Sequence, residues 1–200
     1  MMKFFRVLLV AGGMLFAATA WSGDSEKGLL AFNSNEYDTA LAIWQPLADA
    51  GDAESQYGLG MMYGNGFGVA MDDALALKWY GLAAEQGHSG ALCNLAVMHQ
   101  NGWGVPLNEE EAVRLYSLAA EQGVAEAMVS LGRHFAMDFS DAYDPLEAYK
   151  WFSLAALRDD IDASSKREII AAKLTVEQIA EGNAMVDVWI SGHAGLLAKQ

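Results

Sequence analysis

The sequence contains a single cysteine, Cys93, among its 200 residues. One cysteine allows no intrachain disulfide and cannot assemble a thiolate metal site. Cys93 falls within an apolar helical pattern, where we expect a buried, inert thiol rather than a nucleophile. The folded state must therefore be stabilised by packing.

Signatures of catalysis and of nucleotide binding are also missing. The four histidines include no His-Glu-x-x-His, and neither Ser-x-x-Lys nor Gly-x-Ser-x-Gly occurs. The stretch "GNGFGV" at 64–69 looks like the start of a phosphate-binding loop. However, Val69 stands where the dinucleotide fingerprint needs its third glycine, and the chain has no Gly-Lys followed by Ser or Thr. We therefore expect no catalytic residue, no cofactor and no metal.

Basic residues are scarce, with 12 Lys and Arg against 26 Asp and Glu and a net charge of −14. A surface this acidic repels nucleic acid and anionic lipid headgroups, and it favours basic protein partners or cations. Acidity that serves solubility alone is the open alternative. We expect no nucleic-acid partner.

The N-terminus has the order of a secretory signal peptide. Lys3 and Arg6 precede an apolar run, which ends in the small-x-small site Ala18-Thr19-Ala20. We predict a signal peptide over residues 1–20, with an alternative cut after residue 22. The run is short for a bilayer span, and no cysteine near the cut offers a lipid anchor. The mature chain is expected in the periplasm or secreted, with no membrane segment left.

The glycine stretch recurs as "QNGWGV" at 100–105, after 36 positions. Stacking the chain at that offset gives three ungapped repeats, 52–87, 88–123 and 124–159. A fixed period of this size is typical of a solenoid.

Large and small residues recur in the same columns of all three repeats, at helical spacing. The columns in which the three repeats carry residues of similar size are Leu59, Leu95 and Leu131; Gly60, Ala96 and Gly132; Ala76, Ala112 and Ala148; Trp79, Leu115 and Trp151; and Tyr80, Tyr116 and Phe152. The small residues let two helices approach closely. Each repeat is thus predicted to hold two helices joined by a turn.

Turn and cap residues lie between the two predicted helices. Glycines such as Gly66 and Gly68 can take the positive φ that the turn needs, so they imply no nucleotide. Asp72, Asn108 and Asp144 share the column where a helix N-cap is expected. Asn108 with Glu111, and Thr175 with Gln178, have capping-box spacing.

The pattern "LG-x-MY-x-NG-x-GV … D-x-x-x-A-x-x-WY-x-x-AA-x-QG" resembles the Sel-1-like repeat, an α/α relative of the tetratricopeptide repeat, over residues 52–159. The pattern decays in the third repeat, where Asp138, Ser140 and Asp141 replace the turn's Gly-x-Gly-Val. The resemblance implies an all-α fold, an α/α solenoid of helix-turn-helix repeats. Residues 24–51 and 160–191 are predicted to be capping helices, because terminal repeats cover the open core. Residues 192–200 are predicted to be a tail.

The resemblance implies a non-catalytic scaffold, adaptor or regulator that binds another protein. In such an array the first helices line a concave surface. The phase of the pattern makes five polar residues of these helices candidates for partner binding: Glu54, Gln56, Asn94, Glu126 and Ser130.

Three aromatic residues share a turn column that the family often fills with polar residues: Phe67, Trp103 and Phe139. Aromatic residues are enriched at binding hot spots, so the column is a candidate contact stripe. Packing of these rings against the next turn, with partial exposure, is the favoured alternative.

Two further functions remain open. Some periplasmic Sel-1-like proteins resemble immunity factors that neutralise toxic enzymes, and an acidic exported domain suits that role. Others are associated with β-lactam binding or hydrolysis, but this chain lacks their paired cysteines, so an envelope hydrolase is disfavoured. The sequence identifies neither the partner nor the oligomeric state.

Overall fold

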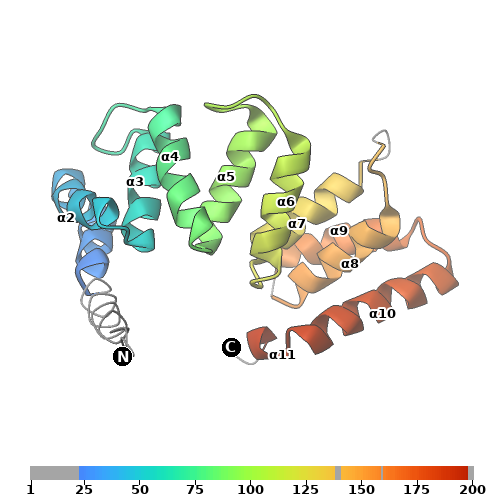
Figure 1. Ribbon diagram of the computed structural model, residues 1–200. Coiled ribbons are helices and arrows are strands. Elements are labelled where there is room, and N and C mark those ends of the chain that lie inside the picture. The colour runs from blue at the N-terminus through green and yellow to red at the C-terminus, as the bar shows by residue number, and fades with distance from the viewer. Residues whose placement is uncertain (1–22, 138–140, 159, 198–200) are drawn as a thin grey trace, which may run out of the picture. The chain divides into compact units, whose positions relative to one another are not determined.

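The computed structural model describes residues 23–137, 141–158 and 160–197, and this part of the chain holds helices and no strand. The expected signal peptide and Phe139 lie outside the described residues. A helix over residues 23–33 comes first. It is followed by α2 (Tyr37–Asp49), α3 (Ala53–Asn65), α4 (Asp73–Glu85), α5 (Ser89–Asn101), α6 (Glu109–Ala120), α7 (Ala125–Phe135), α8 (Pro145–Ala156), α9 (Ile161–Ala171), α10 (Val176–Gly192) and α11 (Ala194–Leu197) (Figure 1). The chain divides into two compact units, Met1–Ala91 and Leu92–Gln200.

Trp44 of α2 lies at the centre of the first unit's core. Its indole is buried, and Nε1 donates a hydrogen bond to the carbonyl oxygen of Ser25 at 3.0 Å. A Cβ at Gly28 would lie 2.3 Å from Nε1, and one at Gly58 would lie 2.7 Å from the indole ring. Both neighbouring helices therefore approach the indole as closely as they do because these two positions are glycine.

The small residues predicted to let helices approach closely do so against aromatic rings. A Cβ at Gly60 would lie 2.4 Å from the Tyr80 ring in the first unit. A Cβ at Gly132 would lie 2.7 Å from the Phe152 ring in the second unit. The glycine and the ring belong to consecutive helices of one repeat, and α3 packs on α4 as α7 packs on α8. This contact explains why a small residue and an aromatic residue recur together.

The buried alanine column completes each helix pair. Ala76, Ala112 and Ala148 are all buried, and so are the large residues three positions later, Trp79, Leu115 and Trp151. Burying a large apolar side chain contributes about 1.5–3 kcal/mol relative to leaving it in water. With no disulfide available, these columns supply much of the stability.

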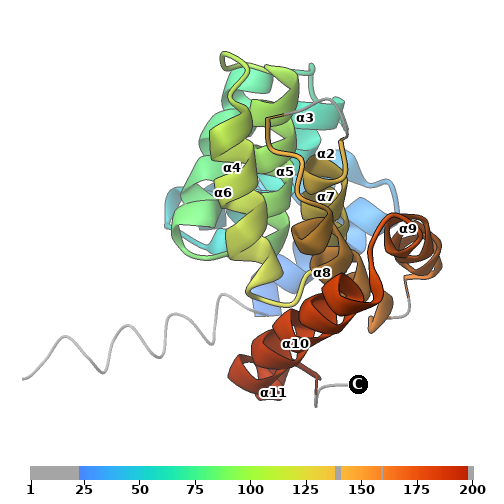
Figure 2. The same cartoon turned by 90° about the vertical axis from the view of Figure 1, so that its right-hand side faces the viewer.

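In the second unit, α8 packs against α7, α9 and α10 (Figure 2). Tyr149 of α8 fits over Gly182 of α10, and its hydroxyl donates to Asn183 Oδ1 at 3.0 Å. The segment 192–200 was predicted to be a tail, but its described part contains α11. That helix is held by Arg158, whose guanidinium donates to the Leu196 carbonyl oxygen at 2.9 Å.

Candidate functional site

The turn of the first two repeats is built on left-handed glycines. Gly66 and Gly68 have φ of 73° and 71°, and Gly102 and Gly104 have φ of 71° and 70°. These angles strain any residue with a Cβ. The glycines lie where the chain leaves the first helix, as the sequence predicts, and the backbone N–H of Trp103 donates to the Met98 carbonyl oxygen at 3.0 Å.

One hydrogen bond closes the turn identically in all three repeats. The backbone N–H of each N-cap residue, Asp72, Asn108 or Asp144, donates at 2.9 Å to a carbonyl oxygen near the end of the preceding helix. The acceptors are Tyr63, His99 and Phe135. The third turn has lost its glycine pattern but keeps this bond, so the residue before the cap has the same backbone anchor in each repeat.

The predicted N-caps are confirmed. Asp72 accepts from the Leu75 N–H at 3.0 Å, Asn108 from the Glu111 N–H at 3.0 Å, and Asp144 from the N–H groups of Leu146 and Glu147. These bonds satisfy N–H groups that a helix start leaves without partners.

Of the two predicted capping boxes, only one is complete. Thr175 and Gln178 bond reciprocally at the start of α10, as expected. At Asn108 only the bond from the Glu111 N–H to the cap side chain forms. The predicted return bond to the Asn108 N–H is wrong, because the Glu111 carboxylate binds the Arg114 guanidinium at 2.7 and 2.8 Å. A charged donor one turn away competes successfully with a backbone N–H.

The aromatic column splits into two different environments. Phe67 is half-buried, and its ring centroid lies 5.4 Å from those of Phe32 and Tyr37. Trp103 keeps 51% of its surface exposed. The expectation of packing with partial exposure therefore describes Phe67, whereas about half of Trp103 is open to solvent.

The five polar candidates of the first helices also differ from one another. The amide of Gln56 donates to the Ala48 carbonyl oxygen at 3.1 Å, which joins α3 to α2. Because Gln56 is only 4% exposed, it offers little surface to a partner. Glu54 and Glu126 are exposed, whereas Asn94 and Ser130 are half-buried. Their binding role stays a prediction.

Three histidine–glutamate pairs were missed by sequence reasoning. His88 Nε2 lies 3.1 Å from Glu54 Oε2, His134 Nδ1 lies 3.0 Å from Glu109 Oε1, and His193 Nε2 lies 2.6 Å from Glu121 Oε2. The partners are far apart along the chain, 34 residues in the first pair and 25 in the second, so no local motif marks them.

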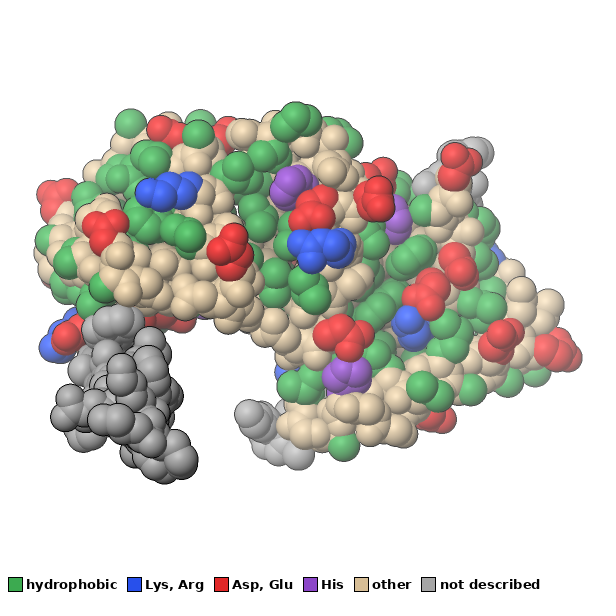
Figure 3. Space-filling model, viewed as in Figure 1, with side chains coloured by type: hydrophobic (Ala, Val, Ile, Leu, Met, Phe, Trp, Pro, Cys, Tyr) green, Lys and Arg blue, Asp and Glu red, His purple; other side chains and the backbone are tan. Residues whose placement is uncertain are grey.

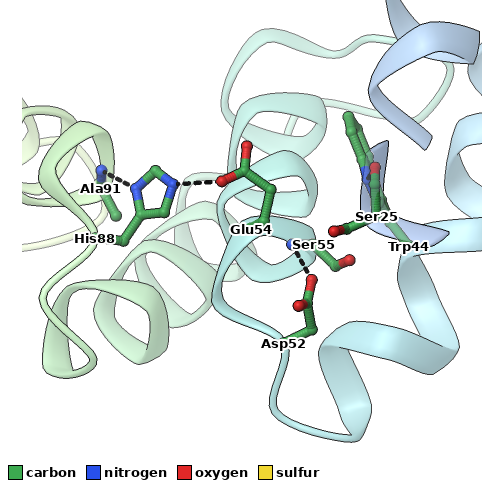
Figure 4. A network of polar contacts seen from close by, with 7 residues as sticks. All are labelled: Ser25, Trp44, Asp52, Glu54, Ser55, His88 and Ala91. Atoms are coloured by element: carbon green, nitrogen blue, oxygen red, sulfur yellow. Dashed lines mark hydrogen bonds and ion pairs between the residues drawn. The ribbon is translucent and has the colours of Figure 1, made fainter. Parts of the chain in front are cut away.

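His88 also caps the start of α5, as Figure 4 shows. Its Nδ1 accepts from the Ala91 N–H at 3.1 Å, so the ring proton lies on Nε2, which faces Glu54 (Figure 4). The ring stacks on Tyr57 with centroids 4.4 Å apart. The hydrogen bond from His88 is the main cause that lowers the pKa of Glu54 below its ordinary value of 4.5.

A groove of about 540 Å³ runs along α10 in the second unit, with mostly apolar walls that include Met185, Val188 and Trp189. Two of its polar side chains are engaged locally, since the Lys150 ammonium lies 2.6 Å from Glu147 and the His193 ring stacks on Trp189.

Within the described ranges, no group of three or more His, Cys, Asp or Glu side chains is placed to hold a metal ion. Nor does any helix of that part of the chain combine the length and the apolar character that a membrane span needs.

Three consecutive matches to the Sel1 repeat family model cover residues 53–88, 89–124 and 125–160. Because these matches cover more than half of the chain, the protein belongs to the Sel1 repeat family. It is an α/α solenoid of helix-turn-helix repeats, the class in which repeats generally mediate protein–protein interactions and are typically non-catalytic.

Solved structures share this fold. A Sel1 repeat protein from Oxalobacter formigenes is 28% identical with a TM-score of 0.68, and the match covers 72% of this chain and 60% of that one. A protective antigen of uropathogenic Escherichia coli with an SLR fold is 23% identical with a TM-score of 0.53, and the match covers 90% of this chain and 49% of that one. The chain thus spans less than two thirds of either relative's length. No curated protein matches.

Proposed function

We propose that this chain is an exported, non-catalytic adaptor or regulator that binds another protein through the turn edge of its repeats. The observation that carries the proposal is Trp103, which projects into solvent from a turn whose backbone is otherwise fixed by hydrogen bonds. Tryptophan is the residue type most enriched at interface hot spots.

The polar side chains that could suggest a catalytic or metal site instead make contacts within the chain, which supports a non-catalytic function. The N-cap side chains bond to helix N–H groups, and three of the four histidines pair with glutamates. The turns therefore expose apolar surface, which suits protein binding better than catalysis.

A crosslinked pull-down from the periplasm tests the proposal. It compares the tagged mature protein with a Trp103→Ser variant and with an Ile169→Ser control, since Ile169 is exposed on α9, away from the turns. Far-ultraviolet circular dichroism verifies that both variants fold. Phe67 is left unchanged because its ring is part of the first unit's packing.

One dominant partner, lost only in Trp103→Ser, is the expected result. A partner that both variants keep would move the contact to the exposed residues of the first helices, Glu54 and Glu126. A partner found only in extract of a competing species would favour the immunity function. With no partner from either source the adaptor proposal fails, and turnover of cell-wall and β-lactam substrates becomes the next assay.

A further inference from the structure

A second column of exposed apolar residues lies beside the aromatic one. The residue immediately before each N-cap is Met71, Leu107 or Tyr143, and these are 68%, 67% and 38% exposed. All three precede the cap residue whose N–H closes the turn, so the same backbone anchor places each of them.

Folding does not require large apolar residues at this position. The residue before an N-cap often packs on the fourth residue of the helix in a hydrophobic staple. Here the fourth residues are Ala76, Ala112 and Ala148, which are buried and offer only a methyl group. The staple is therefore not formed, and Leu107 stays in water although a polar residue would cost less there.

In the second unit, two neighbouring turns bring such residues together. The His134–Glu109 contact of 3.0 Å joins the end of α7 to the start of α6. Leu107 lies two residues before Glu109, and Met137, which is 45% exposed, lies three residues after His134. Figures 1 and 2 both place these turns at the same end of the unit. We call Trp103, Leu107, Met137 and Tyr143 the turn ridge.

Acidic side chains flank the turn ridge. Glu109 and Glu110 follow Leu107 and are exposed, and Asp141 is exposed just before Tyr143. On the face shown in Figure 3, green hydrophobic and red acidic side chains lie next to one another at the upper end of α6. Arg114 is bound to Glu111, and Arg133 at the end of α7 is a single exposed positive charge against the three exposed carboxylates of Glu109, Glu110 and Asp141. The surface around the ridge is therefore apolar with a negative border.

We infer that the turn ridge docks a cationic amphipathic segment of a partner protein, in which apolar side chains alternate with Lys or Arg. Apolar side chains of the segment cover Trp103 and Leu107, and its basic side chains face Glu110 and Asp141. A second copy of this chain is a poor occupant because both surfaces carry the same sign, with a net charge of −14. The inference rests on the proposed protein-binding function and specifies its site and partner chemistry.

Titration calorimetry of the mature protein with a helical peptide of leucine and lysine, at physiological salt, tests this inference. A serine and lysine peptide controls for charge alone, and a leucine and glutamate peptide controls for apolar character alone. The protein variants are Trp103→Ser with Leu107→Ser, and the matched control Ile169→Ser with Val176→Ser, whose two residues are exposed on α9 and at the start of α10, outside the groove.

The inference predicts that only the leucine and lysine peptide binds, and that the ridge variant weakens it at least about tenfold while the control variant does not. Equal affinity for the ridge variant, or for the serine and lysine peptide, would overturn it. So would dimerisation of the wild-type protein that the ridge variant abolishes, since the ridge would then bind a second copy. If the pull-down partner is retained by the ridge variant, the protein-binding function stands and only this site is wrong.

Discussion

Cys93 shows at the scale of one residue how the solenoid core controls chemistry. Its thiol is buried, and burial is the main cause that raises its pKa from 9.0 to about 12. Because the thiolate is the reactive form, the folded protein should leave this cysteine inert.

We predict that iodoacetamide at about pH 8 labels the native protein far more slowly than the protein in urea. Mass spectrometry of quenched time points measures the two rates. Native labelling as fast as labelling in urea would show that Cys93 is accessible and that the core around it is open.

Gly60 and Gly81 are glycines in the helices of one repeat with opposite surroundings. A Cβ at Gly60 would lie 2.4 Å from the Tyr80 ring, whereas nothing lies within 4 Å of a Cβ at Gly81. We expect Gly60→Ala to destabilise the protein by about 1–3 kcal/mol through overpacking. Gly81→Ala should stabilise it by up to about 1 kcal/mol, because alanine is the better helix former.

Urea unfolding followed by circular dichroism measures both changes. If Gly60→Ala is neutral, the close approach of α3 to the Tyr80 ring is not as tight as described, and the explanation of the glycine column fails.

At the scale of the helix, the contact between Glu54 and His88 connects α3 to the start of α5. The His88 hydrogen bond lowers the pKa of Glu54, so the ionised carboxylate is favoured in the folded state. Stability from such a group is present above its unfolded pKa and is lost as pH falls through the lower folded value.

Glu54→Ala should therefore reduce stability by about 0.5 kcal/mol near pH 6, a small effect because the pair is partly exposed. The gap from the wild type should close as pH falls below Glu54's ordinary pKa of 4.5. Glu126→Ala, in the same repeat position of α7, is the control. Urea midpoints across pH measure the gap, and one that persists unchanged to about pH 3 would contradict the account.

Much of each element could be predicted from the sequence, because the 36-residue period places caps, glycines and apolar columns in register. Asp72, Asn108 and Asp144 cap their helices as expected, and Gly60 meets an aromatic ring. These features depend on contacts within one repeat, which a local pattern records.

Contacts outside the local pattern could not be predicted. Phe67 and Trp103 share a column, yet Phe67 packs on Phe32 and Tyr37 within the first unit, whereas Trp103 is 51% exposed. The histidine–glutamate pairs depend on the spacing of helices rather than on sequence spacing. Leu107 is exposed because Ala112, at the fourth position of the helix, is too small to form a hydrophobic staple with it.

For the molecule as a whole, we propose that a Sel1 repeat chain of net charge −14 binds a partner protein at the turn edge of its second unit. The core and caps account for the repeated residues that stabilise the fold. They leave Trp103 and Leu107 as large apolar side chains with half or more of their surface exposed.

Site-specific photo-crosslinking in living cells shows whether a partner contacts the turn edge. A benzoylphenylalanine placed at position 107 should, on illumination, join the protein to one dominant partner, whereas the same group at position 169 on α9 should not. Equal crosslinking from both positions, or from position 169 alone, would contradict the account, and so would the absence of any adduct at position 107.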